Sequence, residues 1–568
     1  MNTQRPSHTP TRRTVLRAGG ALGAAGAAGA IFASTAGAET APAQKGIPMP
    51  AAPADGHQVF QHGVASGDPL PNAVLLWTRA TSSPEDQPGA ERGAPVNLAW
   101  QVATDEGFSD VVAGATVTSD PAADNTVKVD ADGLAPSTDY FYRFIVADGP
   151  YAGQTTVTGR TRTTPDPTSS PEHLGIALTS CANWESGYFS AYRDMADNPD
   201  IDIIMCVGDY IYEYGVGEYS GKLGPIREHK PAHEIITLAD YRLRYGTYRT
   251  DADLQAAHAS KPWMVTWDDH EVANDDWAHG AENHTEGEEG SYEARRDAAM
   301  QAYLEWLPVR ATEASAGGHL YRNFSFGDLA EIVMLDLRTY RSQQVTFTGM
   351  KQIDDEGRTM LGSEQFNYLA GQWRTSDAKW NLVGNSVMFT PVLIPPMDPE
   401  ATRAVTQLLG LPEEGAPYNF DQWDGYAAER RRVIRMIGDE GLDNVVFLTG
   451  DIHSSWACNV PKEVGRYPEG GVAAIEIVCT SVSAPNIDDI VKLPQDNAIS
   501  HTAETALAGV NRHVQWIEFD RHGYVAVHVQ PDDIRAEYRL VEDKSVPNQP
   551  LFTAKTFIGR RGEGIREA

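Results

Sequence analysis

The stretch IDIIMCVGDYIY, residues 201–212, indicates the fold class because an apolar run ends abruptly in a polar loop. The first seven residues have the length and composition of a buried strand, and the Gly-Asp pair that follows allows a sharp turn. Asp209 at that turn would point out from the end of the strand. The stretch VVFLTGDIH, residues 445–453, repeats this arrangement with Asp451 and His453.

Three further apolar runs end in polar loops in the same way. They are 174–178 before Ser180 and Cys181, 263–267 before Asp268, Asp269 and His270, and 381–383 before Asn385. Residues 293–306 have helical spacing of apolar side chains. In α/β sheets, functional groups collect beyond the carboxyl ends of the strands, so five such loops predict one shared site. The absence of a repeat or a second linker predicts a single α/β catalytic domain over 172–555.

The region before this domain has the pattern of short strands. Residues 96–102 and 140–146 alternate apolar and polar side chains, which is typical of half-buried strands. The run from Leu134 to Tyr142 resembles a loop and tyrosine strand of fibronectin III or immunoglobulin-like modules. We therefore predict a small all-β sandwich domain over 57–165, followed by a linker rich in proline and serine.

The first residues have the pattern of an export signal. Arg12 and Arg13 precede an uncharged stretch rich in alanine and glycine at 18–36, and residues 36–38 have the small-x-small form of a cleavage site. This pattern resembles a twin-arginine signal peptide over 1–38, with an ordinary Sec signal as the alternative. Residues 39–56 are predicted to be a flexible lead-in. We expect a secreted or extracytoplasmic protein without a transmembrane anchor after signal cleavage.

Composition limits the classes of partner and cofactor. The chain has 568 residues, with 46 basic and 78 acidic side chains, which gives a formal charge of −32. Stable binding to nucleic acid is not expected, because a phosphate backbone is bound by clustered cations. The 4 cysteines are too few for a disulfide-dense scaffold or a paired-cysteine zinc site. Cys458 and Cys479 could pair after export, but the sequence leaves their pairing open.

The strand-end loops carry two kinds of metal ligand. Cys181, Asp209, Tyr212 and His453 offer thiolate, carboxylate, phenolate and imidazole. A phenol with a free pKa of about 10 ionises only beside a strong Lewis acid, which favours Fe3+. Taken singly, each residue has a structural alternative: a turn aspartate, a buried cysteine, a core tyrosine or a capping histidine. Their conjunction at separate strand ends is what favours a metal site.

The second kind of ligand is hard oxygen. Asp268, Asp269 and Asn274 lie in or just after the loop that follows residues 263–267. Carboxylate and amide oxygens suit Ca2+ or Mn2+, so the sequence predicts a mixed cluster of metal ions.

Together these motifs resemble the PhoD family of alkaline phosphatases and phosphodiesterases, over about 57 to 545. The motifs are SC at 180–181, GDYIY at 208–212, WDDHE at 267–271, LDLRTYR at 335–341, QWDGY at 422–426, TGDIHS at 449–454, HGVASGDP at 62–69 and LWTR at 76–79. The resemblance implies an α/β metallophosphoesterase fold, which is a two-sheet sandwich flanked by helices, preceded by the N-terminal all-β domain.

The resemblance also implies a division of ligands. Cys181, Asp209, Tyr212 and His453 would hold Fe3+, with Asp209 bridging to Ca2+. The calcium candidates are Asp268, Asp269, Asn274 and Asp451. The chain has Asp-Asp-His-Glu where other metallophosphoesterases have Asn-His-Asp/Glu, and Asp451 where a histidine is usual. These departures favour calcium over a second transition metal and leave the individual ligand assignments open.

Three residues are predicted to act on the substrate. Hydroxide activated by Fe3+ would attack phosphorus, and His270 would protonate the leaving group or hydrogen-bond to phosphate. The alternative for His270 is a role in orienting a metal ligand. Arg338 could contact a phosphate oxygen, although pairing with a structural carboxylate is an equal alternative. Asn183 is a further candidate for a polar contact with substrate.

The sequence therefore predicts an exported, monomeric, metal-dependent phosphoric ester hydrolase that acts on small phosphoesters. The close alternative is an iron- and calcium-dependent phospholipase D that acts on phospholipids, which would need an apolar rim around the site. A third possibility, from another class, is a surface-binding protein without catalysis. The complete set of metal motifs counts against it.

Overall fold

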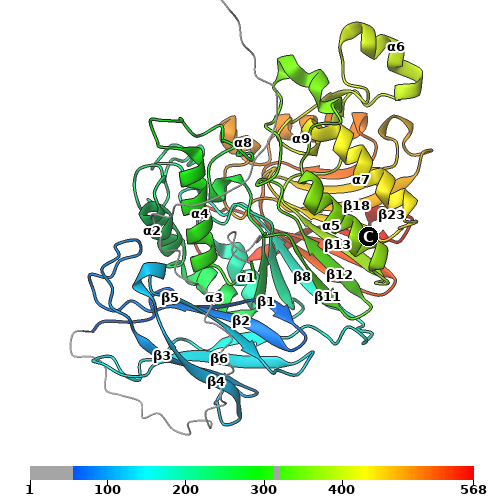
Figure 1. Ribbon diagram of the computed structural model, residues 1–568. Helices are drawn as coiled ribbons and strands as arrows, with labels where there is room; N and C mark the ends of the chain where they lie inside the picture. Colours follow the sequence, from blue (N-terminus) through cyan, green and yellow to red (C-terminus); the bar gives the residue numbers. More distant parts are fainter. Residues whose placement is uncertain (1–55, 312–318) are drawn as a thin grey trace, which may run out of the picture.

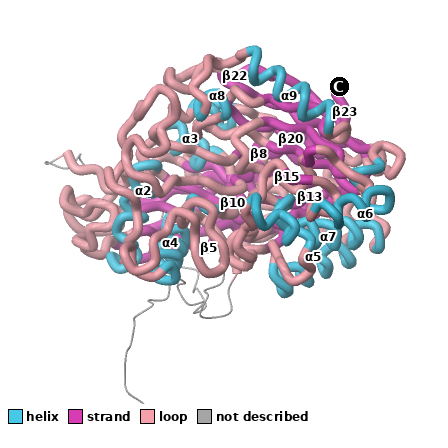
Figure 2. Tube along the Cα trace, turned by 90° about the horizontal axis from the view of Figure 1, so that it is seen from above, coloured by secondary structure: helices cyan, strands magenta, loops and turns pink. Residues whose placement is uncertain are grey.

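The computed structural model describes residues 56–311 and 319–568 (Figure 1). The predicted signal peptide, and the lead-in up to residue 55, lie outside the described residues. Within the described ranges, no helix is both long and apolar enough to cross a membrane. The described residues form two large β-sheets packed face to face, with a smaller four-stranded sheet at one end (Figure 1). Figure 2 shows helices on two sides of the strands.

The larger sheet has ten strands and contains three of the predicted strand ends. In spatial order its strands are β23 (Gly564–Glu567), β22 (Leu551–Arg560), β21 (Asp533–Val541), β20 (His522–Val529), β8 (Leu174–Thr179), β9 (Ile203–Cys206), β10 (Pro262–Val265), β1 (Val64–Leu70), β2 (Ala73–Arg79) and β5 (Thr126–Asp132). Strands β8, β9 and β10 are parallel, so their carboxyl ends meet at one edge.

The second sheet has seven strands and contains the other two predicted strand ends. Its strands are β11 (Arg322–Phe326), β12 (Ala330–Met334), β13 (Trp380–Asn385), β16 (Val445–Thr449), β18 (Val472–Val478), β17 (Ser455–Pro461) and β19 (Val514–Glu518). Strands β12, β13, β16 and β18 run parallel.

Side-chain alternation along β9 explains the layers. Ile203 and Met205 face the core between the two sheets, whereas Ile204 and Cys206 face the outer core under the first group of helices. The period of two places successive side chains on opposite faces, so a strand that is apolar throughout must be covered on both sides. The first sheet is covered by α1 (Ser190–Asp197), α2 (Leu238–Tyr248), α3 (Ala252–Ser260) and α4 (Tyr292–Trp306). The second is covered by α5 (Gly362–Thr375) and α7 (Ala427–Asp439).

Three further helices lie outside these layers. They are α6 (Pro399–Leu409), which is carried by the short hairpin of β14 (Leu393–Ile394) and β15 (Ala416–Pro417), the single-turn α8 (Ile487–Ile490), and α9 (Ala498–Val510). Figure 1 shows α6 standing clear of the sheets.

The N-terminal region is all β, but it shares a sheet with the catalytic region. Its separate sheet consists of β4 (Val111–Thr118), β3 (Asn97–Ala103), β6 (Asp139–Val146) and β7 (Gly159–Arg162). This sheet packs on β1, β2 and β5 around an apolar core that includes Val74, Leu98 and Tyr142. Strand β1 also pairs in parallel with β10, with Ser66 opposite Pro262. The predicted sandwich is therefore joined to the catalytic region by a continuous sheet, which local sequence patterns did not reveal.

The last residues are strands. Strand β22 crosses the predicted domain limit at residue 555, and β23 extends the ten-stranded sheet to Glu567. These strands complete one edge of the sheet, far from its other edge at β5.

Candidate metal centre

The loops that follow β8, β9 and β16 have an unusual backbone. Cys181, Asp209, Asp451 and His453 have positive φ angles of 60°, 54°, 69° and 50°. Positive φ is uncommon for residues with a Cβ atom, and such strain costs of order 1–3 kcal/mol for each residue and is concentrated at functional sites. Gly208 makes the turn before Asp209 possible, because a Cβ atom at this position would lie 2.4 Å from Cβ of Asp268. The backbone thus directs these side chains toward one another.

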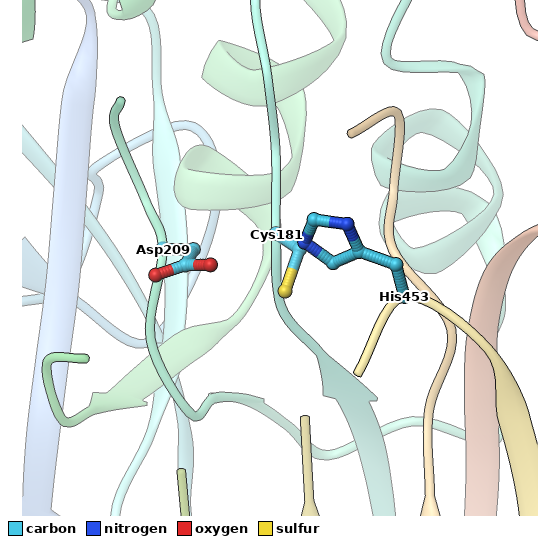
Figure 3. Close-up of side chains that lie close together, drawn as sticks. All are labelled: Cys181, Asp209 and His453. Carbon is cyan, nitrogen blue, oxygen red and sulfur yellow. The ribbon is translucent and has the colours of Figure 1, made fainter. Parts of the chain in front are cut away.

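The first group of side chains, which we call the mixed cluster, consists of Cys181, Asp209, Tyr212 and His453. Ligand atoms of Cys181, Asp209 and His453 all lie within 4.8 Å of one another, and Figure 3 shows these three side chains projecting from separate segments. The Tyr212 hydroxyl donates to Asp209 Oδ2 at 3.0 Å and lies 3.1 Å from His453 Nε2. The structure therefore brings together all four residues predicted to hold iron.

The donor atoms of the mixed cluster fit a cation. Asp209 Oδ1 is buried and has no hydrogen-bond partner. Burial raises the pKa of Asp209 to about 8 and raises the pKa values of the Cys181 thiol and the Tyr212 phenol well above their ordinary range. Burial alone thus disfavours the charged forms, and a cation among these donors would reverse that preference. The donor atoms of the mixed cluster are therefore buried and polar, and one of them lacks a hydrogen bond. These properties suit a metal ion.

His453 has the tautomer that a metal ligand needs. Its Nδ1 lies 2.8 Å from the Pro485 carbonyl oxygen, which can only accept, so Nδ1 carries the hydrogen. The lone pair is then on Nε2, which faces Tyr212 and the rest of the mixed cluster. Burial lowers the pKa of His453 to about 4, which keeps the ring neutral. A backbone carbonyl behind a ligating histidine is the usual way to orient the ring.

The second group, which we call the carboxylate cluster, consists of Asp268, Asp269, Asp421 and Asp451. Oxygens of Asp268, Asp269 and Asp451 lie within 4.8 Å of one another, as do those of Asp269, Asp275 and Asp421. Asp209, Asp269 and His270 form a further group within the same limit, so Asp209 and Asp269 connect the two clusters. Asp421 was missed in the sequence, although it immediately precedes the recognised QWDGY motif.

Arg338 lies inside the carboxylate cluster. Its guanidinium bonds Asp268 through two nitrogens, with Nη2 3.0 Å from Oδ2, and donates to Asp421 Oδ2 at 2.8 Å. Nη2 is also 3.4 Å from an oxygen of Asp269 and 3.5 Å from one of Asp451. The Arg338 side chain is 0% exposed. This geometry favours the alternative reading of Arg338, in which it pairs with carboxylates rather than with phosphate.

His270 is held by an acid that the sequence did not single out. Its Nδ1 lies 2.7 Å from Glu213 Oε2, and Glu213 follows Tyr212 directly in the chain. Burial alone would lower the pKa of His270, but the charges of Glu213, Asp269 and Asp209 raise it well above 6.5. The imidazole ring centre is 4.3 Å from that of Tyr212. His270 therefore lies beside the mixed cluster, with its Nδ1 held by Glu213.

Glu271, the glutamate of the WDDHE motif, bonds backbone groups. It accepts backbone N–H groups from Asp268 at 2.7 Å and from Asp209 at 3.1 Å, and it also bonds the amide of Tyr210. It thereby ties the loop after β9 to the loop after β10. Its side chain supports the backbone of both clusters, whereas Glu213 orients His270.

Two predicted site residues are engaged elsewhere. The Asn274 amide nitrogen Nδ2 donates to Glu282 Oε2 at 3.2 Å, and its backbone N–H donates to Glu213. The Asn183 side chain donates to the Tyr219 carbonyl at 2.9 Å and accepts from the Glu185 amide at 2.9 Å. Asn183 thus orders the loop after β8.

Cys458 and Cys479, whose pairing the sequence left open, are both free and buried.

Known proteins resemble this chain over most of its length. The family described as PhoD-like phosphatase matches residues 176–538, and its N-terminal domain matches 45–165. Alkaline phosphatase D of Bacillus subtilis (strain 168) is 37% identical over 526 residues, covering 91% of this chain and 84% of the relative. A solved structure entitled "Structure of PhoD" has a TM-score of 0.78 and 34% identity, and the match covers 92% of this chain and 93% of that one. A purple acid phosphatase from yellow lupin, PPD1, gives a TM-score of 0.49 at 13% identity over 87% and 73% of the two chains, too distant to bear on the site.

Proposed function

Because the chain belongs to the PhoD-like phosphatase family and is a phosphoric ester hydrolase, we propose that it cleaves small phosphoesters outside the cytoplasm with Fe3+ and Ca2+ as its metal ions. The observation that carries the proposal is the convergence of thiol, phenol, imidazole and an unpartnered buried carboxylate oxygen in the mixed cluster. The twin-arginine pattern supports export.

In this proposal the two clusters hold different metals. Cys181, Asp209, Tyr212 and His453 hold Fe3+, since phenolate and thiolate together favour a trivalent iron. Asp268, Asp269 and Asp451 hold Ca2+, which prefers carboxylate oxygens. When bound, such cations stabilise the negative charge that develops on the phosphoryl and leaving oxygens and lower the pKa of water in the site.

The protein groups supply positioning and a proton. His270, kept protonated by neighbouring carboxylates, is placed to donate a proton from Nε2 to the leaving oxygen, because Glu213 occupies Nδ1. Arg338 holds Asp268 and Asp421 in place. Glu271 fixes the two loops that present Asp209 and Asp268.

Metal analysis of the purified protein tests the proposal. We expect about one iron for each chain together with calcium, and a visible absorption band from Tyr212 bound to iron. Tyr212→Phe should abolish that band, whereas Tyr418→Phe, which alters a tyrosine that is 40% exposed, should leave it unchanged. Zinc as the only metal, or a band that persists in Tyr212→Phe, would contradict the assignment.

Exposed apolar side chains on α6 are the feature that supports phospholipids as the second candidate substrate class. Val405, Leu408 and Leu409 on α6 are 55%, 84% and 63% exposed. Their spacing places them on one side of a helix that stands clear of the sheets (Figure 1). Hydrolysis rates on p-nitrophenyl phosphate, bis-p-nitrophenyl phosphate and phosphatidylcholine vesicles separate the candidates. Small phosphoesters should be cleaved faster, and a preference for the vesicles would support a phospholipase.

A further inference from the structure

One loop bonds two proposed iron ligands, the backbone of Cys181 and the side chain of His453. Ser483 and Ala484 both donate their backbone N–H groups to the Cys181 carbonyl, at 3.3 and 3.2 Å. The next residue, Pro485, accepts from His453 Nδ1 at 2.8 Å. We call residues 483–485 the ligand-support loop. The position of this loop affects both the thiol of Cys181 and the ring orientation of His453. A residue that holds the loop in place therefore also positions these two members of the mixed cluster.

A buried ammonium group bonds the ligand-support loop, in addition to the Ser481 hydroxyl, which donates to the Ala484 carbonyl, and the Asn183 carbonyl, which accepts from the Ser483 hydroxyl. Lys544 Nζ lies 2.9 Å from the Ser483 carbonyl oxygen and 3.5 Å from that of Ala484. It also pairs with Asp489 Oδ2 at 2.6 Å and lies 2.9 Å from His522 Nε2. The Lys544 side chain is 10% exposed. Lys544 follows β21 and thus belongs to the C-terminal edge of the sheet, far along the chain from all four ligands.

The backbone of Lys544 is also anchored. Its carbonyl oxygen accepts from the Tyr188 amide at 2.8 Å, which ties the C-terminal segment to the loop after β8. The side chain therefore extends from a fixed point into the ligand-support loop. A charged donor held in this way makes stronger hydrogen bonds to carbonyls than a neutral donor does.

We propose that Lys544 is a positioning residue of the metal centre: its ammonium group holds the Ser483 and Ala484 carbonyls so that Pro485 orients His453 and the loop fixes Cys181. The inference rests on the proposed function, since that proposal names Cys181 and His453 as iron ligands. Loss of the ammonium removes the donor to the Ser483 carbonyl and to Asp489, whereas the Ala484 carbonyl keeps the Ser481 hydroxyl at 2.9 Å. The loop then moves to recover hydrogen bonds, and the two ligands lose their alignment.

Removal of iron from the intact, metal-loaded protein by EDTA measures this role. Lys544→Met should release iron about 10 to 100 times faster than the wild type, the usual range for loss of a residue that orients a metal ligand. The visible band from Tyr212 should shift, because the field of the other ligands changes. Lys544→Arg keeps the charge and should release iron at a rate between those of the wild type and Lys544→Met.

Lys222 provides a matched control in the same acidic surroundings. Its Nζ pairs with Asp488 Oδ2 at 2.5 Å and donates to the Leu493 carbonyl at 2.9 Å. It also lies 3.6 Å from Asp489. Lys222→Met removes a neighbouring ammonium group without removing the donor to Ser483 and Ala484. Its iron release should stay within about twofold of the wild type, even where both variants lower the melting temperature.

The outcomes separate this inference from the proposed function. Iron release from Lys544→Met at the wild-type rate, or equal acceleration in Lys222→Met, would overturn the positioning role while leaving the function intact. A wild-type protein that binds no iron would overturn both. If Lys544→Met does not fold, Lys544→Gln, which can donate to one carbonyl, takes its place with the same expected order and the same criteria.

Discussion

The mixed cluster and the carboxylate cluster lie side by side, but their charges are balanced differently. In the carboxylate cluster, Arg338 is a cation provided by the chain itself, bonded to Asp268 and Asp421. In the mixed cluster, Asp209 Oδ1 has no partner, and burial raises the pKa values of its acidic donors. Asp209 and Asp269 join the two clusters.

This difference indicates how each cluster depends on metal. The carboxylate cluster can remain compact in the metal-free protein, because a buried charge is tolerated when it is paired. Burial raises the pKa values of acids in both clusters, but the described donors of the mixed cluster bond no arginine or lysine. A metal ion that binds there would therefore displace protons. The following substitutions test that contrast, beginning with the largest expected effect.

Asp209→Asn should have the largest effect because Asp209 belongs to the mixed cluster and connects it to the carboxylate cluster. We expect kcat/KM on p-nitrophenyl phosphate to fall at least about 10⁴-fold, or about 5.5 kcal/mol of transition-state stabilisation. Iron content should fall in parallel. Asp443→Asn, which alters an exposed pair with Arg561, is the control and should leave both values unchanged. Retained iron and activity in Asp209→Asn would remove Asp209 from the centre.

Arg338→Met tests the internal cation of the carboxylate cluster. In the presence of a chelator, the free energy of unfolding should fall by about 3 kcal/mol, because Asp268 loses its buried partner and Asp421 keeps only Arg341. Added calcium should restore much of this loss, since it supplies positive charge to the same carboxylates. Denaturant unfolding with and without calcium measures both effects.

Arg430→Met is the matched control for that experiment. Arg430 is equally buried and pairs with Asp424 and Glu414, outside both clusters. It should destabilise the protein by a similar amount, but calcium should not compensate. Equal rescue of the two variants would show that calcium acts on the protein generally, and the contrast between the clusters would then lose its support.

Glu213→Gln should have a smaller effect that is confined to catalysis. The substitution keeps the shape of the side chain but removes the charge beside His270 Nδ1. We expect kcat to fall about 10- to 100-fold, as for other residues that orient a functional histidine. The iron content should stay unchanged, unlike in Asp209→Asn. Glu282→Gln, which alters an acid that bonds only the side chain of Asn274, should leave kcat unchanged.

Much of this centre could be predicted because its residues follow strands. An apolar run that ends in Gly-Asp identifies a strand end, and parallel strands place such ends at one sheet edge. Cys181, Asp209, Tyr212 and His453 were found in that way, and the structure brings them together. The strands themselves, such as β9 and β16, also lie where the sequence predicted them.

The rest depends on contacts that no local pattern encodes. The pairing of β1 with β10 joins residues almost 200 positions apart, so periodicity showed two strands but not their neighbours. Glu213 and Asp421 are single acids in a chain with many, and only the folded geometry places one on His270 and the other on Arg338. Lys544 bonds the ligand-support loop through backbone carbonyls, and every residue has a backbone carbonyl. No residue type in the sequence therefore indicates this contact.

Asn274→Ala should have the smallest effect. It tests whether Asn274 binds calcium, as the sequence predicts, or bonds Glu282, as in the structure. The sequence predicts Asn274 as a calcium ligand, and in the structure the Nδ2 of this side chain donates to Glu282 Oε2 at 3.2 Å. Calcium affinity, measured by titration calorimetry, should fall by no more than about threefold, the size of one partly exposed hydrogen bond. Asp451→Asn should weaken calcium binding far more. Equal losses in the two variants would mean that Asn274 leaves Glu282 when calcium binds, and the carboxylate cluster would then include an amide ligand.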